Sequence, residues 1–462
     1  MSAPDALELR DPATGDPIGT LPIAGPDQVA AAVAAARAAA ASWATTPAQA
    51  RAELLCEAAD RLYAVTDELA ARTTAEMGKP LSDAAGGVDA AVSTMRQYAA
   101  LGPLHRGRSL QGAVGSTDLM HRVPRGVAAC IVPWNDPIAI AVQGIAANLA
   151  VGNTVVCKPS PRAPFSVAAA VSCFDHLPPG VVNLVQGDDT TGQLLVESDV
   201  DVVVFTGSVA AGRWIAQRCA GRFVHTVLEL GGNDPLVVDR DVDPIWAAEQ
   251  AATGAFANAG QICVSVERIY CHEDVAEPFT AALVARAAAL RTGDGRTDGT
   301  ELGPLVDLAH REQVHAHVTD AIARGAQLRV GGEVPDGPGA FYPATVLSDV
   351  PAGARILSEE TFGPVAPVVT VGSFDEGLAL AASGEHGLAA TVLTGSQAHA
   401  QEAWRRLPVG TVKINAVFGG APGGAAHPHG VSGNSLGYGP ELLDELTRYR
   451  VVHLEPATPQ SG

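Results

Sequence analysis

The first hundred residues carry apolar positions at the three- and four-residue spacing of amphipathic helices. One Ala-rich helix is expected over 29–43. A second is expected to begin near Pro47, with Thr46 as its N-cap and the proline in its first turn. Its buried stripe comprises Leu54, Leu55, Ala58, Leu62, Val65 and Leu69. The Gly-Lys-Pro sequence at 78–80 ends this helical region.

From Gly126 onward, short continuous apolar runs alternate with helical segments. Such runs are typical of strands in a parallel sheet that is covered on both faces. Strands are expected over 127–132, 154–158, 181–185, 200–205 and 224–230. The helices between them are expected over 138–150, 166–174 and 211–220. This alternation predicts an α/β fold with a doubly wound sheet.

A second series of strands and helices follows. Helices are expected over 245–256, 278–290 and 311–324, and strands over 267–271 and 367–371. The last expected strand, 447–454, stands apart from any helix. We expect it to be an edge strand with which another subunit can pair.

Charge and composition narrow the classes of function. The chain has 462 residues and a net charge of −20, which repels both a phosphate backbone and an anionic lipid surface. Neither nucleic acid nor a membrane is therefore an expected partner. The N-terminus lacks the pattern of a signal peptide, and polar residues interrupt the longest uncharged stretch, 137–157, so we expect a cytoplasmic protein. The seven cysteines are irregularly spaced and include no C-x-x-C, so we expect neither a disulfide framework nor a zinc knuckle.

Three residues are candidates for chemistry. Cys263 follows an alanine and a glycine that let the backbone approach a ligand, and a nucleophilic thiol needs that access. Glu229 ends an apolar run, where burial raises the pKa of a carboxyl group and suits it to act as a general base. Asn135 follows a strand, where its amide can donate to an oxyanion. Each has an ordinary alternative: a core cysteine, a glutamate paired with arginine, and a turn asparagine.

The segment FTGSVAAG, between an expected strand and helix, indicates a dinucleotide site. Gly207 permits a tight turn there, and the helix N-terminus presents free amides to a pyrophosphate. The segment lacks the G-x-G-x-x-G fingerprint of generic Rossmann domains. Lys158 and Ser160, after another strand, can reach a ribose or a phosphate, although such a lysine is also explained as a solvated loop cation.

Six segments stand in a fixed order along the chain: PWN, KPS, FTGSxxxG, LELGGN, GQxC and EExFGPV. In this order and spacing the chain resembles the aldehyde dehydrogenase superfamily, of the hydrolytic type that does not acylate CoA. The resemblance implies a Rossmann-type cofactor domain (1–104 and 126–230), an α/β catalytic domain (231–436) and a β oligomerisation arm (105–125 and 437–462). It also implies a homodimer or homotetramer.

The resemblance further implies NAD(P)-dependent oxidation of a small aldehyde to a carboxylic acid, without a metal. Cys263 would form a thiohemiacetal and then a thioester, which water activated by Glu229 would hydrolyse. Asn135 and the backbone N–H of Cys263 would hold the oxyanion. The implied cofactor-binding residues are Trp134, Lys158, Ser160, Gly207, Ser208, Gly212, Leu230, Glu360 and Phe362. Among these, Lys158 would bind the adenosine ribose, Glu360 the nicotinamide ribose, and Phe362 would brace the nicotinamide.

The chain departs from the family pattern at Pro161, where many NAD-preferring members carry a glutamate. NAD is still the expected cofactor, with NADP as the alternative, since Lys158, Ser160 and Arg162 are available for its extra phosphate. Asp136 leads to the hypothesis that the substrate is polar or cationic.

Residues 418–430, with His427 and His429, replace a common family segment. We expect a flexible surface loop there, with contact to substrate or to a neighbouring subunit as the alternative.

Three other functions share part of this pattern. In a CoA-acylating semialdehyde dehydrogenase CoA takes the acyl group, and the presence of Glu229 argues against it. A non-catalytic cofactor-binding protein has no need for Cys263, Glu229 and Asn135 together. A cysteine hydrolase has no use for the dinucleotide segments. The aldehyde itself stays open among amino- or amido-aldehydes, semialdehydes and aromatic aldehydes.

Overall fold

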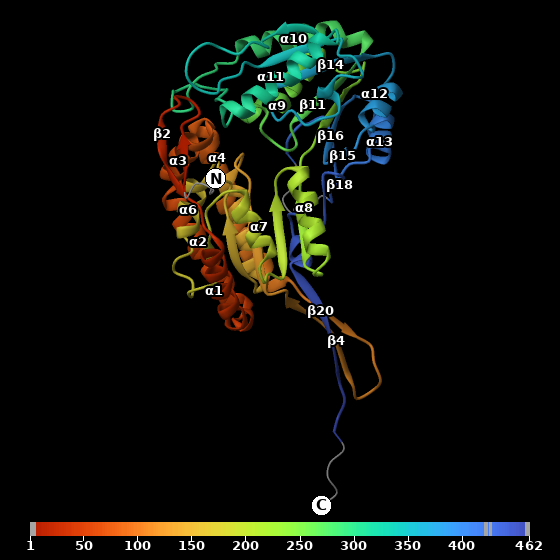
Figure 1. Ribbon diagram of the computed structural model, residues 1–462. Helices are drawn as coiled ribbons and strands as arrows, with labels where there is room; N and C mark the ends of the chain where they lie inside the picture. Colours follow the sequence, from red (N-terminus) through yellow and green to blue (C-terminus); the bar gives the residue numbers. More distant parts are fainter. Residues whose placement is uncertain (1–5, 420–423, 425–426, 458–462) are drawn as a thin grey trace, which may run out of the picture.

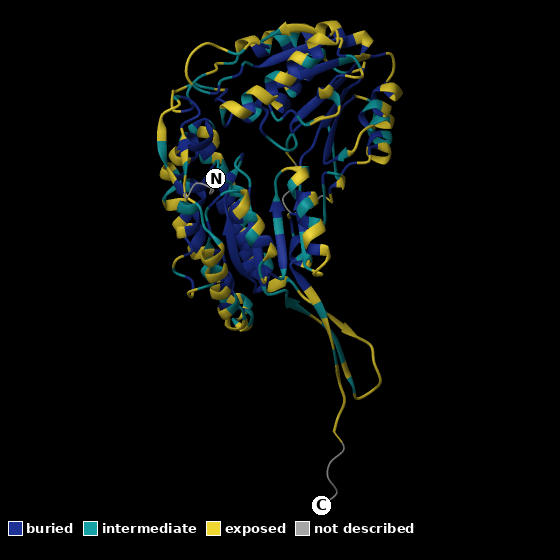
Figure 2. Cartoon of the chain, in the orientation of Figure 1, coloured by how far each residue is buried: buried dark blue, intermediate teal, exposed yellow. Residues whose placement is uncertain are grey.

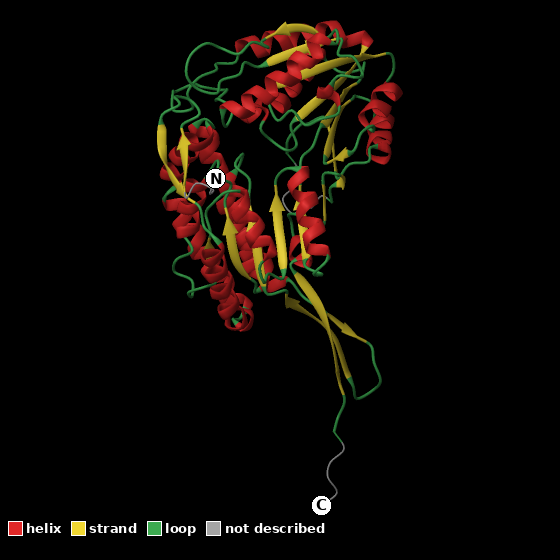
Figure 3. Ribbon diagram, viewed as in Figure 1, coloured by secondary structure: helices red, strands yellow, loops and turns green. Residues whose placement is uncertain are grey.

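The computed structural model describes residues 6–419, 424 and 427–457. It contains two large sheets and a small sheet that extends away from them (Figures 1 and 3). The six-stranded sheet has the order β19-β9-β8-β5-β6-β7, and all of its pairings are parallel except that of β19. Its strands are β5 (Val127–Ile131), β6 (Thr154–Lys158), β7 (Val182–Leu184), β8 (Val202–Thr206), β9 (His225–Glu229) and β19 (Gly433–Asn434).

Helices cover both faces of the six-stranded sheet. Along β5, Ala128 and Cys130 belong to one apolar cluster, whereas Val127 and Ala129 belong to the cluster on the opposite face. This alternation follows from the two-residue period of a strand, and two covered faces explain the continuous apolar runs in the sequence. The helices of this half are α1 (Pro26–Thr45), α2 (Ala48–Ala64), α3 (Thr66–Met77), α4 (Leu81–Leu101), α5 (Pro137–Val151), α6 (Pro164–Ser172), α7 (Asp189–Glu197) and α8 (Val209–Ala220).

The helical first part differs from prediction in three ways. Helices α4 and α7 lie where the sequence pattern predicted none. The expected second helix is divided, because Val65 ends α2 and precedes α3. Thr46 was wrong as an N-cap, since Pro47 takes that position in an extended conformation and no side chain caps α2. The Thr46 hydroxyl instead donates to the carbonyl of Ser42 at the end of α1.

The seven-stranded sheet has the order β12-β13-β14-β11-β10-β16-β17. Its strands are β10 (Asp234–Val238), β11 (Val266–His272), β12 (Gln327–Val330), β13 (Thr345–Ser348), β14 (Val365–Val371), β16 (Ala389–Leu393) and β17 (Thr411–Ile414). Its helices are α9 (Pro244–Phe256), α10 (Glu273–Ala289), α11 (Leu308–Ala323), α12 (Phe374–Ala381) and α13 (Gln397–Arg406). Helix α10 begins before the expected position, because the His272 side chain caps it and Pro278 lies inside it.

The small sheet joins β3 (Arg108–Leu110), β4 (Thr117–Pro124) and β20 (Thr447–Leu454), and it extends from the body with much of its surface exposed (Figure 2). The predicted strand at 447–454 is confirmed. It pairs with β4, and within the described part of the chain its other edge has no strand partner. Pairing with another subunit stays a prediction, as do the domain boundaries. Short elements complete the chain: β1 (Ala6–Arg10), β2 (Pro17–Pro22), β15 (His386–Gly387), β18 (His429–Gly430) and α14 (Leu442–Glu445).

The predicted α/β class with parallel sheets is confirmed. Among the described helices, none is both long enough and apolar enough to span a bilayer.

Candidate active site

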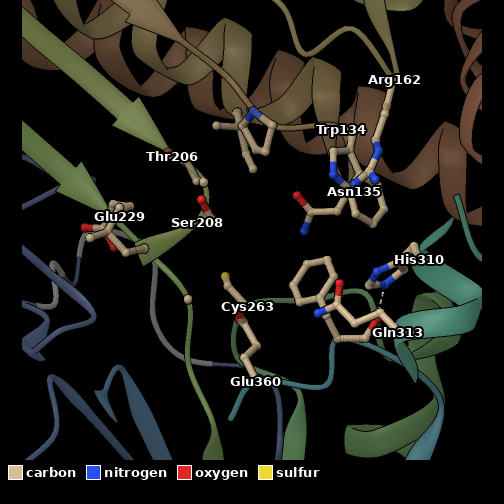
Figure 4. Close-up of a pocket in the computed structure, with 16 residues that line it drawn as sticks. Trp134, Asn135, Arg162, Thr206, Ser208, Glu229, Cys263, His310, Gln313 and Glu360 are labelled. Carbon is tan, nitrogen blue, oxygen red and sulfur yellow. Dashed lines mark hydrogen bonds between the residues drawn. The ribbon is translucent and has the colours of Figure 1, made fainter. Parts of the chain in front are cut away.

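A pocket lies where the carboxyl ends of β5, β8 and β9 face loops of the seven-stranded sheet (Figure 4). Ligand sites in open α/β sheets commonly lie outside the carboxyl ends of the strands. The residues that line it are Pro133, Trp134, Asn135, Ile140, Arg162, Thr206, Gly207, Ser208, Glu229, Leu230, Gly231, Cys263, His310, Gln313, Glu360 and Phe362. The pocket thus brings the three predicted catalytic residues together.

The backbone before Cys263 is unusual. Asn258, Ala259 and Gly260 are consecutive left-handed residues, with φ of 50°, 56° and 72°. A Cβ on Gly260 would lie 2.1 Å from the carbonyl oxygen of Gly363, so only glycine fits this approach. The sequence suggested that this glycine lets the backbone approach a ligand. In the structure it lets the backbone approach the neighbouring loop at Gly363 instead.

The Cys263 thiol faces the pocket from a carboxyl-rich environment. Burial raises its pKa to about 12, and the nearby carboxyl groups of Asp234, Glu229 and Glu360 add to the shift. The thiol therefore holds its proton at neutral pH. Burial likewise raises the pKa of Cys271 to about 12, but that thiol lies in the core and does not line the pocket.

Asn135 is held in a fixed orientation. Its Nδ2 donates to the carbonyl of Gln261 at 3.0 Å, and its own carbonyl accepts from Nδ2 of Asn258 at 3.1 Å. An amide nitrogen carries two N–H groups, so one remains after the bond to Gln261. In Figure 4 the amide faces the space above the Cys263 sulfur.

Glu229 ends β9, and its carboxyl group is deeply buried. Burial raises its pKa to about 8, and the backbone amide of Gly437 offsets only part of this shift. Its Oε1 has no hydrogen-bond partner among the described residues. A Cβ on Gly437 would lie 2.0 Å from this oxygen, so the carboxyl occupies space that glycine leaves open. Figure 4 shows the side chain beside the pocket, away from the Cys263 sulfur.

One side of the pocket is built by the turn between β8 and α8. Ser208 is the N-cap of α8, and its hydroxyl accepts from the amide of Ala211 at 3.3 Å. Gly212, one turn into the helix, allows close packing, because a Cβ there would lie 2.4 Å from the Leu230 side chain. The first amides of α8 are therefore presented at the pocket.

The facing side carries Glu360 and Phe362. Oε1 of Glu360 accepts from the amide of Gly232 at 2.9 Å, and burial raises the pKa of this carboxyl. Phe362 has a left-handed backbone with φ of 54°, and its ring makes edge contacts with Trp134 and His310. A Cβ on Gly231 would lie 2.2 Å from Oε2 of Glu360, so this carboxylate fills a space that glycine leaves open.

A family model described as "Aldehyde dehydrogenase family" matches residues 1–452. The chain belongs to the aldehyde dehydrogenase family. It is 36% identical to a succinate-semialdehyde dehydrogenase of Paenarthrobacter nicotinovorans, covering 94% of this chain and 98% of that protein. It is 35% identical to a benzaldehyde dehydrogenase [NAD(+)] of Pseudomonas putida, covering 96% and 92%. An NADP-dependent enzyme of E. coli superposes with a TM-score of 0.95 at 32% identity, covering 98% and 95%.

The predicted family, fold and activity class are thus confirmed. The pocket of this aldehyde dehydrogenase also fits a nicotinamide dinucleotide. The α8 N-terminus suits a pyrophosphate, and the buried Glu360 carboxylate, with Oε1 held by one amide, suits ribose hydroxyls. Among the described residues, no cluster of His, Cys, Asp or Glu can hold a metal ion.

Three predicted cofactor residues, Lys158, Ser160 and Gly212, do not line the pocket. The Lys158 ammonium donates to the carbonyls of Pro159 and Gly187, and burial lowers its pKa to about 8. Arg162, in contrast, lies over the Trp134 ring and pairs with Asp307 at 2.8 Å. The backbone amide of Arg162 also donates to the Ser160 hydroxyl at 3.2 Å, and a phosphate-binding role for Lys158, Ser160 and Arg162 stays a prediction.

The structure does not support the hypothesis that Asp136 selects a polar or cationic substrate. Its carboxylate pairs with Lys79 at 3.1 Å and does not line the pocket. The loop with His427 and His429 lies partly outside the described residues, because 420–423 and 425–426 are not described. Both histidines are exposed, with ring centroids 6.5 Å apart.

The pocket residues that sequence reasoning missed include His310 and Gln313, in the first turns of α11. Their i, i+3 spacing puts them on one helix face. Asp307, which caps α11, was the available signal, but the expected helix began only at residue 311.

Proposed function

We propose that this aldehyde dehydrogenase oxidises its aldehyde to the carboxylic acid, with NAD(P)⁺ as hydride acceptor, through a covalent intermediate on Cys263. The observation that carries the proposal is the convergence of Cys263, Glu229 and Asn135 on one pocket that also receives the N-terminus of α8. A thiol, a buried carboxyl group and a fixed amide donor are the groups that this chemistry needs.

In the first half of the reaction, the Cys263 thiol gives its proton to solvent, and the sulfur bonds to the aldehyde carbon while the carbonyl π electrons move onto the oxygen. The oxygen of the resulting thiohemiacetal is stabilised by the free N–H of Asn135 and by the backbone N–H of Cys263. Because Gln261 already fixes the Asn135 amide, this donor needs no reorientation as charge develops. When bound, the dinucleotide supplies the hydride acceptor. Loss of the hydride from carbon leaves a thioester on Cys263.

In the second half, water hydrolyses the thioester. Glu229 accepts the proton of this water, and its raised pKa places the change of protonation near the working pH. The carboxyl must reach the thioester from the position beside Gly437, so a movement of this side chain accompanies hydrolysis. The products are a carboxylic acid and the free Cys263 thiol.

We propose a semialdehyde as the substrate, by analogy with the succinate-semialdehyde dehydrogenase relative that covers nearly the whole chain. Benzaldehyde is the second candidate, because the relative named for it is 35% identical over 458 residues. For the cofactor we propose NAD⁺ first and NADP⁺ second. NAD⁺ is the cofactor named for the benzaldehyde dehydrogenase relative. NADP⁺ is the alternative because Pro161 lacks the carboxylate that would repel a 2′-phosphate and a structural neighbour is NADP-dependent.

The decisive experiment follows NADH and NADPH formation with succinate semialdehyde and benzaldehyde, without CoA, alongside Cys263→Ala. We expect the wild-type protein to reduce a cofactor and release the acid, and the variant to do neither. A wild-type protein that binds both cofactors but oxidises no aldehyde would favour the non-catalytic alternative. Acyl release only on addition of CoA would favour the acylating alternative.

We also propose that the protein is a homodimer or homotetramer, because β20 offers an edge without a strand partner among the described residues. Light scattering of the intact protein, compared with a Val451→Pro variant of the exposed edge, tests this. A monomeric wild-type protein would rule it out.

A further inference from the structure

A buried carboxylate beneath the pocket joins several of its segments. Glu267 lies on β11, four residues after Cys263, and is 4% exposed. It accepts from Nδ2 of Asn233 at 3.0 Å and from the backbone amides of Thr361 at 2.9 Å and Phe362 at 2.7 Å. One side chain therefore ties the strand after the nucleophile to the turn after β9 and to the loop that carries Glu360 and Phe362.

The loop needs this support because Phe362 has an unfavourable backbone. A left-handed conformation in a bulky residue persists only where the surroundings hold it. Glu267 binds the amide of Phe362, and Nε2 of His310 lies 2.7 Å from its carbonyl oxygen. Burial lowers the pKa of His310, so the neutral ring donates this hydrogen bond. Both backbone polar groups of Phe362 are thus bound by buried side chains.

The same carboxylate also acts on Glu360. Asn233, which Glu267 orients, donates to the carbonyl of Glu359 at 3.2 Å. Its neighbour Gly232 donates its amide to Oε1 of Glu360 at 2.9 Å. These hydrogen bonds therefore fix the turn after β9 relative to the loop that carries Glu360, at the point where the Glu360 carboxylate enters the pocket.

We propose that Glu267 is a positioning residue that sets the cofactor affinity and the hydride-transfer geometry, because it fixes Glu360 and Phe362 from below. The inference rests on the proposed function in that these two residues face the cofactor. Glu267 does not line the pocket, so it acts through the loop and touches no reactant.

The test compares Glu267→Gln with a matched control, Asp239→Asn. Asp239 lies after β10, at the opposite end of the same sheet, and is also buried. It accepts from the hydroxyl of Thr394 and the amide of Arg240, and it bonds to Nδ1 of His399. Two readouts are needed. NAD⁺ affinity is measured by calorimetry without aldehyde, and the primary kinetic isotope effect is measured with a 1-deuterated aldehyde. The melting temperature reports on the stability of each variant.

We expect Glu267→Gln to weaken NAD⁺ binding about tenfold, as when a hydrogen bond to a charged group is weakened, and to raise the isotope effect. Asp239→Asn should lower the melting temperature similarly and change neither readout. Equal behaviour of the two variants would overturn the proposal. If Glu267→Gln does not fold, two His310 variants replace it. His310→Gln keeps a hydrogen-bond donor and His310→Ala does not, so we expect the loss of NAD⁺ affinity mainly in His310→Ala. Because the calorimetry needs no turnover, its outcome is separate from that of the proposed reaction.

Discussion

Glu229 at the pocket and Glu267 behind its facing loop both have buried carboxyl groups, but their hydrogen bonding is very different. Glu229, on the six-stranded sheet, has an oxygen without a hydrogen-bond partner among the described residues. Glu267, on the seven-stranded sheet, accepts from three N–H donors. Burial raises the pKa of both carboxyl groups. Burial alone therefore does not assign a role to a carboxyl group. The number of its hydrogen-bond partners distinguishes a group that can transfer a proton from one that stabilises the surrounding backbone.

The largest expected effect is on turnover of Glu229→Gln. The amide cannot accept a proton from water, so hydrolysis of the thioester should slow by about 10²–10⁴. Thioester formation does not use Glu229 in the proposed reaction, so a rapid burst of one NADH per site should remain. Stopped-flow absorbance measures the burst and the steady rate separately. Loss of the burst together with the steady rate would mean that Glu229 serves the first half of the reaction as well.

The backbone of the nucleophile loop gives the next largest effect. In Gly260→Ala, a left-handed alanine costs about 1–2 kcal/mol, and its methyl group must also displace the Gly363 carbonyl. We expect a clear fall in the free energy of unfolding together with loss of activity. Gly221→Ala is the control, since this glycine has a helical φ of −65° and nothing within 4 Å of an added Cβ. Equal stability of the two variants in urea titrations would contradict the tight packing of this loop.

A smaller effect concerns stability and pH. The pKa of Glu229 is about 8 when folded, well above its ordinary value, so the folded state holds the proton more tightly. The contribution of protonated Glu229 to the free energy of unfolding is therefore fully present below the ordinary pKa of a glutamate, and it is lost as the pH rises through about 8. Glu229→Gln, which never ionises, should melt above the wild-type protein at pH 8–9, with the gap closing toward pH 5. If Glu229→Gln were less stable than the wild-type protein at every pH, Glu229 would stabilise the fold through its hydrogen bonds, as Glu267 does.

The same contrast explains what the sequence could and could not predict. Asn135, Glu229 and Ser208 lie at the ends of regular strands or at a helix N-terminus, so hydrophobic periodicity located them. Glu267 and His310 act through partners 94 and 52 residues away. The left-handed turn at Asn258 and Ala259 includes an alanine, a residue that rarely adopts this conformation. Long-range hydrogen bonds decide these positions, and no local pattern records them.

Helix α4 was missed for a local reason. Its sequence is rich in alanine and includes Gly86 and Gly87, which lower helix propensity. Packing of Val88, Val92 and Met95 into the core outweighs that cost. Tertiary burial, which one sequence does not show, therefore decided this element.

The smallest expected effect belongs to Asp136, a carboxylate outside the pocket. It is partly exposed and pairs with Lys79, and such pairs contribute about 0–1 kcal/mol. Asp136→Asn should therefore leave the ranking of anionic, neutral and cationic aldehydes by kcat/KM unchanged and lower the melting temperature only slightly. Lys79→Met should have the same small effect, and the double variant should cost no more than either single change. A selective loss with cationic aldehydes in Asp136→Asn alone would restore the recognition role that the ion pair argues against.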